Sequence, residues 1–176
     1  PERTTAGPSS GSIVRDVHIL LATDADWIVD EVTAALGGPD TTFTVCREGR
    51  VVADVIAERT PDLAILDLQV GSMGGMAITM SLRLDESGGT LPNVPVLMLL
   101  DRHADLFLAQ RSGADGWLIK PLDALRLRRA LMAITQGGTY FEGLPEPDVD
   151  DDAVETDDER ATEVDGTAEE EPAPAG

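Results

Sequence analysis

The chain has 176 residues and a net charge of −20, from 33 acidic against 13 basic side chains, which argues against non-specific binding to nucleic acid. Its single cysteine, Cys46, excludes an internal disulfide, and the sequence shows neither an apolar run long enough to cross a membrane nor a signal-peptide pattern. Length and composition therefore predict a cytoplasmic protein that does not bind membranes, with one folded domain and additional segments.

The acidic charge is concentrated near the C-terminus. Residues 142–176 carry 15 acidic side chains and one arginine, and they show no apolar periodicity. Such a segment cannot bury enough apolar surface to offset the entropy that is lost on ordering. We therefore predict an acidic disordered tail over residues 139–176, a flexible arm rich in Pro, Gly, Ser and Thr over residues 1–14, and a folded domain over residues 15–138.

Within the folded domain, short apolar runs alternate with helical patterns. The sequence predicts, in chain order, a strand at 18–22, a helix at 27–36, a strand at 42–46, a helix at 49–59, a strand at 63–66, a helix at 76–84, a strand at 96–100, a helix at 101–112, a strand at 117–119 and a helix at 123–135. Ile28, Val32 and Leu36 illustrate the helical spacing, since residues four apart share one face. The first, second and last of these helices are ended by glycine or proline, at Gly37-Gly38-Pro39, Pro61 and Gly137-Gly138.

The order of these elements determines the fold class. Five strand–helix units whose strands are almost wholly apolar indicate a parallel sheet with helices on both faces. Right-handed crossovers then leave only a few topologies. We therefore predict an α/β, doubly wound sheet of five strands.

Charged residues follow three of the predicted strands. Asp24 comes soon after the first strand, Asp67 directly after the third, and Lys120, the only lysine in the chain, directly after the fifth. The carboxyl ends of strands in such a sheet converge on one crevice. Two carboxylates and one ammonium group in a crevice can hold a divalent cation and accept a phosphoryl group.

These residues and their surroundings resemble the receiver domain of two-component response regulators. The resemblance rests on Pro61-Asp62-Leu63-Ala64-Ile65-Leu66-Asp67-Leu68-Gln69 and on Gly113-Ala114-Asp115-Gly116-Trp117-Leu118-Ile119-Lys120-Pro121. It implies a flavodoxin-like sheet of order 2-1-3-4-5, with Asp67 as the phosphoacceptor and Lys120 in contact with the phosphoryl oxygens. It also implies Mg²⁺, held by Asp24, Asp67 and the backbone carbonyl of Gln69.

The same resemblance implies the partners. A bacterial receiver accepts its phosphoryl group from a histidine kinase or a phosphotransfer protein. The residues after 138 are too acidic and polar for a DNA-binding helix-turn-helix, so we expect output through protein–protein contacts with an unknown downstream protein and without nucleic acid. The sequence leaves open whether the protein forms a homodimer.

Three departures from the family pattern bear on how the site works. Thr23 stands where the family has a second acidic residue, and Leu100-Asp101 stands where it has a Thr or Ser followed by a small residue. The loop at 71–75 is Gly-Ser-Met-Gly-Gly, which is richer in glycine than the family's usual loop. The missing hydroxyl at Leu100 and the missing acid at Thr23 favour an alternative function, a phosphorylation-independent adaptor with the receiver fold, whereas the presence of both Asp67 and Lys120 disfavours it.

Two further interpretations concern Gln69 and Trp117. Phosphatases that use an aspartate nucleophile need a second aspartate two residues later as the general acid. Gln69 occupies that position and cannot donate a catalytic proton, so we do not expect an enzyme. Trp117 stands at the family's output aromatic position, and simple packing between the last two helices would explain it equally well.

Overall fold

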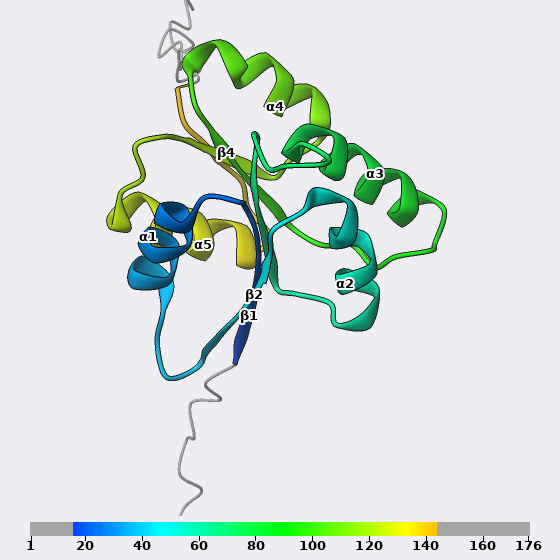
Figure 1. The fold of residues 1–176 in the computed structure, drawn as a ribbon, viewed down its shortest axis with the longest axis horizontal. Coiled ribbons are helices and arrows are strands. Elements are labelled where there is room, and N and C mark those ends of the chain that lie inside the picture. Colours follow the sequence, from blue (N-terminus) through cyan, green and yellow to red (C-terminus); the bar gives the residue numbers. More distant parts are fainter. Residues whose placement is uncertain (1–15, 144–176) are drawn as a thin grey trace, which may run out of the picture. The chain divides into compact units, whose positions relative to one another are not determined.

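The computed structural model describes residues 16–143, which form one parallel sheet flanked by helices (Figure 1). The strands are β1 (Val17–Ala22), β2 (Thr41–Cys46), β3 (Leu63–Asp67), β4 (Val96–Leu100), β5 (Gly116–Ile119) and β6 (Tyr140–Phe141). Their order is β2-β1-β3-β4-β5-β6, and every neighbouring pair is parallel. The predicted order 2-1-3-4-5 and the flavodoxin-like class are confirmed, and β6 is a sixth strand that the sequence did not reveal.

The helices follow the predicted sites with small changes at their ends. They are α1 (Asp26–Leu36), α2 (Val52–Glu58), α3 (Gly75–Ser87), α4 (Leu106–Ser112) and α5 (Ala124–Thr135). Single 3₁₀ turns, η1 (Gly49–Val51) and η2 (His103–Asp105), precede α2 and α4, so the predicted helices at 49–59 and 101–112 are shorter as α-helices. Helices α1 and α5 cover one face of the sheet, and α2, α3 and α4 cover the other (Figure 1).

The central strands are buried on both faces, as their apolar sequences require. On the side of α1 and α5, alternate residues of β1 such as Ile19 and Leu21 pack against Ile28 and Leu127. The other alternate residues, such as Leu20, face α2 and α3. Each such side chain contributes about 1.5–3 kcal/mol by leaving water. This rigid sheet fixes where the carboxyl ends of its strands lie.

Strand β6 adds a segment to the free edge of β5. The Trp117 indole nitrogen donates to the Glu142 carbonyl at 2.8 Å, and the Phe141 ring lies 4.3 Å from the Trp117 ring, centroid to centroid. A Cβ on Gly116 would lie 2.6 Å from the Tyr140 carbonyl oxygen, so the close approach requires glycine there. Trp117 is therefore only 2% exposed. It packs in a cluster on the side of α4, with β6 covering it.

The position of β6 also changes the predicted boundary of the tail. The sequence places residues 139–143 in a disordered tail, but they contain β6 and the turn after it. A strand of two residues is too short to show periodicity. Its main anchor, Glu142, looks in the sequence like the first acid of the tail. The predicted arm over residues 1–14 and the rest of the predicted tail, from residue 144, lie outside the described residues.

Candidate functional site

Asp67 lies at the end of β3 and is almost completely buried, at 2% exposure. Three donors hold its carboxylate. Lys120 Nζ lies 2.7 Å and the Gln69 backbone N–H lies 3.1 Å from Oδ1, while the Thr23 hydroxyl donates to Oδ2 at 2.9 Å. Burying a carboxylate is costly unless it is paired and hydrogen-bonded, and this one has both kinds of partner. The carboxylate therefore has a fixed orientation at the edge of the sheet.

Lys120 directly follows β5 and brings its ammonium group to this carboxylate. Its backbone N–H donates to the Leu100 carbonyl at 2.8 Å, which continues the pairing of β4 with β5. Nζ therefore lies close to Asp101, the residue after β4, with 3.0 Å between Nζ and Asp101 Oδ1. The Trp27 ring of α1 lies 5.8 Å from Nζ, centroid to nitrogen. One cation thus contacts two carboxylates and faces an aromatic ring.

Asp24 lies on the same edge of the sheet. It follows Thr23 and is exposed, and a Cβ on Gly71 would lie 3.2 Å from its Oδ2, so its carboxylate lies against the loop that follows β3. Within residues 16–143 no group of three or more His, Cys, Asp or Glu side chains is placed to hold a metal ion. Mg²⁺ needs less, because it is commonly bound through one or two carboxylates and retained waters. Asp24 and Asp67 are two carboxylates at one edge of the sheet, which is the type of donor that Mg²⁺ uses.

This fold and this pairing of Asp67 with Lys120 have a counterpart among known families. The sequence profile of the response regulator receiver domain matches residues 19–132, well over half of the chain. The chain belongs to the response regulator receiver family. The resemblance carried by the surroundings of Asp67 and Lys120 is therefore confirmed, and with it the assignment to two-component systems.

Relatives of this receiver are longer proteins. The transcriptional regulatory protein CseB of Streptomyces avermitilis is 29% identical over 133 residues, which are 74% of this chain and 54% of that protein. The DNA-binding response regulator MtrA of Mycobacterium tuberculosis is 30% identical over 106 residues, which are 59% of this chain and 44% of that protein. The chain thus spans about half the length of these relatives.

Solved structures show the same receiver fold. The receiver domain of NtrX from Brucella abortus matches with a TM-score of 0.57 at 24% identity, covering 67% of this chain and 98% of that one. The signal receiver domain of a signal transduction histidine kinase from Syntrophus aciditrophicus matches with a TM-score of 0.61 at 23% identity, covering 69% of this chain and 91% of that one. At these identities the likeness establishes the fold alone.

The structure brings two unexpected residues into the receiver's site. Thr23 stands in the sequence at the place of a lost acid, but its hydroxyl donates a hydrogen bond to Asp67. Asp101 stands at the place of a small residue, but its carboxylate contacts Lys120. A signal for Asp101 was present, because an acid after the fourth strand lies at the same sheet edge as Asp67. Sequence spacing could not show which oxygen faces which nitrogen.

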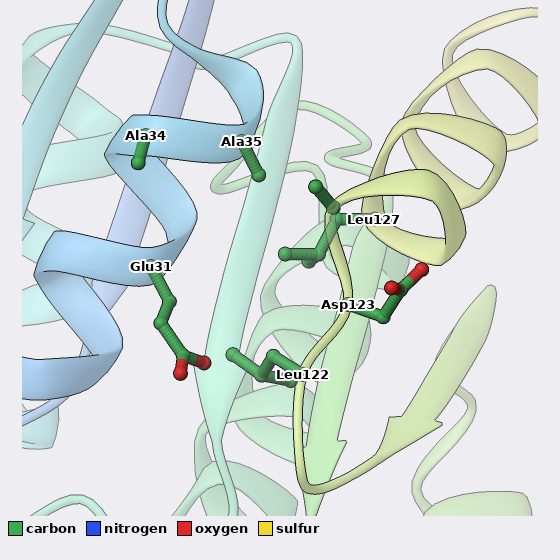
Figure 2. A pocket seen from close by; sticks show the side chains of 7 residues that line it. Glu31, Ala34, Ala35, Leu122, Asp123 and Leu127 are labelled. Atoms are coloured by element: carbon green, nitrogen blue, oxygen red, sulfur yellow. The ribbon is translucent and has the colours of Figure 1, made fainter.

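A separate pocket of about 310 Å³ lies between α1 and the start of α5 (Figure 2). Its walls include Glu31 and Ala35 from α1, Leu122 and Asp123 from the loop before α5, and Leu127 from α5. The Asp123 carboxylate already caps α5, since its Oδ1 accepts two backbone N–H groups at 3.0 Å each. None of the side chains around Asp67 described above lines this pocket.

No helix within residues 16–143 is long and apolar enough to cross a membrane.

Proposed function

We propose that this receiver accepts a phosphoryl group on Asp67 from a histidine kinase or a phosphotransfer protein. The observation that carries the proposal is the buried Asp67 carboxylate at the end of β3, with Lys120 Nζ 2.7 Å from Oδ1. A buried carboxylate with a cation fixed beside it is what an aspartate nucleophile for phosphoryl transfer needs. The protein is then a signalling partner and not an enzyme.

The reaction assigns a task to each side chain. An Asp67 oxygen attacks the phosphorus, a new O–P bond forms, and the P–N bond to the donor histidine breaks, leaving an acyl phosphate on Asp67. Lys120 is placed to contact the phosphoryl oxygens as a point charge. The Gln69 N–H keeps the carboxylate oriented. Mg²⁺, held by Asp24, Asp67 and the Gln69 carbonyl, would neutralise charge on the transferring group.

The output is proposed to pass through protein–protein contacts. MtrA is described as a DNA-binding response regulator, and the described residues of this chain contain the receiver part alone. The net charge of −20 opposes direct contact with the phosphate backbone and so supports a protein as the downstream partner. A cytoplasmic location belongs to the same proposal, on the ground of composition.

A phosphorylation-independent adaptor is the second candidate, and one observation favours it. Thr23, Gln69 and Lys120 together already satisfy the Asp67 carboxylate, so the site is stable without a phosphoryl group. In this alternative the ion pair of Asp67 with Lys120 serves only to hold β3 and β5 together.

A phosphorylation assay separates the two functions. The protein is incubated with acetyl phosphate, with and without Mg²⁺, and examined by intact mass and by phosphate-affinity gel, with Asp67→Asn as the control. The proposal expects a gain of one phosphoryl group that needs Mg²⁺ and is lost in the variant. No gain, together with no response to beryllofluoride, would refute the phosphoacceptor proposal and favour the adaptor.

A further inference from the structure

The carboxylate of Asp101 contacts the same ammonium group as the phosphoacceptor. Asp101 Oδ1 lies 3.0 Å from Lys120 Nζ, and Asp67 Oδ1 lies 2.7 Å from it. The Lys120 side chain is 10% exposed and that of Asp67 is 3% exposed, while that of Asp101 is 36% exposed. Lys120 is therefore shielded from water and held between a buried carboxylate and a carboxylate at the surface.

We propose that Asp101 is a positioning residue that holds Lys120 and thereby restrains phosphoryl acceptance at Asp67. The inference rests on the proposed function of Asp67. It adds that the Asp101 carboxylate already contacts the Lys120 ammonium group, which the incoming phosphoryl oxygens need as their cation. Asp101 is a restraint of this site and touches no reacting atom.

The backbone fixes this contact. The Lys120 N–H donates to the Leu100 carbonyl, so the residues after β4 and β5 leave the sheet side by side. Asp101 is the first residue after β4, and its short side chain reaches Nζ from that position. Since Lys120 is largely buried, an ion pair here is screened less than one at the surface. The contact therefore links the buried Lys120 side chain to a carboxylate at the surface.

The charges make this contact unfavourable for transfer. With acetyl phosphate as donor, an Asp67 oxygen bonds to phosphorus, the bond from phosphorus to the acetyl oxygen breaks, and acetate leaves with the electron pair. A carboxylate of charge −1 becomes an acyl phosphate of charge about −2 near neutral pH. Asp101 repels this added charge and competes with the phosphoryl oxygens for the positive charge of Lys120. Removing the Asp101 charge should therefore speed acceptance.

The first experiment tests the contact without any phosphorylation. Lys120 is the only lysine in the chain, so ¹⁵N-lysine labelling yields a single side-chain ammonium signal in an NMR spectrum. In Asp101→Asn we expect this signal to move and its protons to exchange faster with water. In Asp54→Asn, which removes an exposed acid from α2, it should stay in place. A signal unchanged by Asp101→Asn would overturn the inference.

The second experiment measures the rate of phosphoryl uptake from acetyl phosphate at saturating Mg²⁺. We expect Asp101→Asn to raise the initial rate about tenfold, as one unit charge a few ångströms from the phosphoryl group implies. Asp101→Glu, which keeps the charge, should remain slow, and Asp54→Asn should match the unmodified protein. A purely structural role for Asp101 would not order the variants by charge.

Other outcomes overturn the inference in distinguishable ways. A slower rate with a higher Mg²⁺ requirement in Asp101→Asn would show that Asp101 helps to hold the metal. An unchanged rate in a protein that does accept phosphoryl groups would refute the restraint and leave the proposed function standing. Absence of uptake in the unmodified protein and in every variant would refute both, because Asp101 would then not be what limits the site.

Discussion

The hydrogen bond from Thr23 to Asp67 can be tested by replacing Thr23 with valine. The two side chains have similar shapes, and the change exchanges the hydroxyl for a methyl group. Thr23 is fully buried, and its hydroxyl donates to Asp67 Oδ2 at 2.9 Å and accepts from the Ala25 N–H at 3.2 Å. Thr23→Val therefore removes a donor from a buried carboxylate and an acceptor from a backbone N–H at the start of α1.

The size of the effect follows from these partners. A hydrogen bond to a charged group contributes about 1.5–3 kcal/mol, and the neutral bond to the Ala25 N–H adds roughly 0.5–1 kcal/mol. Asp67 is only 2% exposed, so water cannot easily replace the lost donor. We expect Thr23→Val to lower the free energy of unfolding by about 2–4 kcal/mol.

A matched control is available in α3. Thr79 is also fully buried, but its hydroxyl donates to a neutral group, the Gly75 carbonyl, at 2.8 Å. Thr79→Val should cost about 0.5–1.5 kcal/mol. Both variants are unfolded in urea, and their stabilities are compared by the midpoints of the unfolding transitions, provided that the free energy of unfolding falls with urea at the same slope in both. If the two valine variants lose the same stability, the reasoning about Asp67 is wrong. The cost of Thr23→Val should also shrink when Asp67 is already alanine.

Three other predictions concern β6 and the core. Glu142→Ala should lower the free energy of unfolding by about 1–3 kcal/mol in urea, because the Glu142 carboxylate accepts the Ile119 N–H at 2.8 Å, and an unchanged midpoint would contradict this contact. Gly116→Ala should destabilise the protein by more than about 1 kcal/mol, because the added methyl group clashes with β6. Gly38→Ala is the control and should be tolerated, since a Cβ there has its nearest contact 3.7 Å away. Equal melting temperatures of the two variants would count against the clash. Burial raises the pKa of the Cys46 thiol above its ordinary value. Cys46 should therefore react slowly with a disulfide reagent at pH 8 until urea unfolds the chain. Rapid labelling of the native protein would refute its burial.

The sequence predicted those parts of the fold that depend on repeated patterns. Five apolar runs separated by helices are enough to define a parallel sheet, and the end of each strand places its next residue at a known edge. The amino-acid sequence alone was therefore enough to place Asp67 and Lys120 together. The contact between them is confirmed at 2.7 Å.

The remaining features depend on single contacts and leave no periodic signal. Strand β6 has only two residues and is held by Glu142. In the sequence Glu142 cannot be told apart from the acidic residues that follow it. The roles of Thr23 and Asp101 depend on which atom faces which, and side-chain directions at the ends of strands are set by loops. The sequence could mark these residues as departures from a pattern, but their chemistry depends on the three-dimensional arrangement of their atoms.

The edge strand β6 sets the limit of the smallest fragment that should fold faithfully. The receiver profile ends at residue 132, yet hydrogen bonds from β5 reach ten residues further, to Glu142. A fragment cut at residue 138 would leave the Trp117 indole N–H and the Ile119 N–H without partners, on the strand that leads directly to Lys120. The choice of domain boundary therefore affects the site itself. Any fragment of this chain that is compared with other receivers should include residues 139–143.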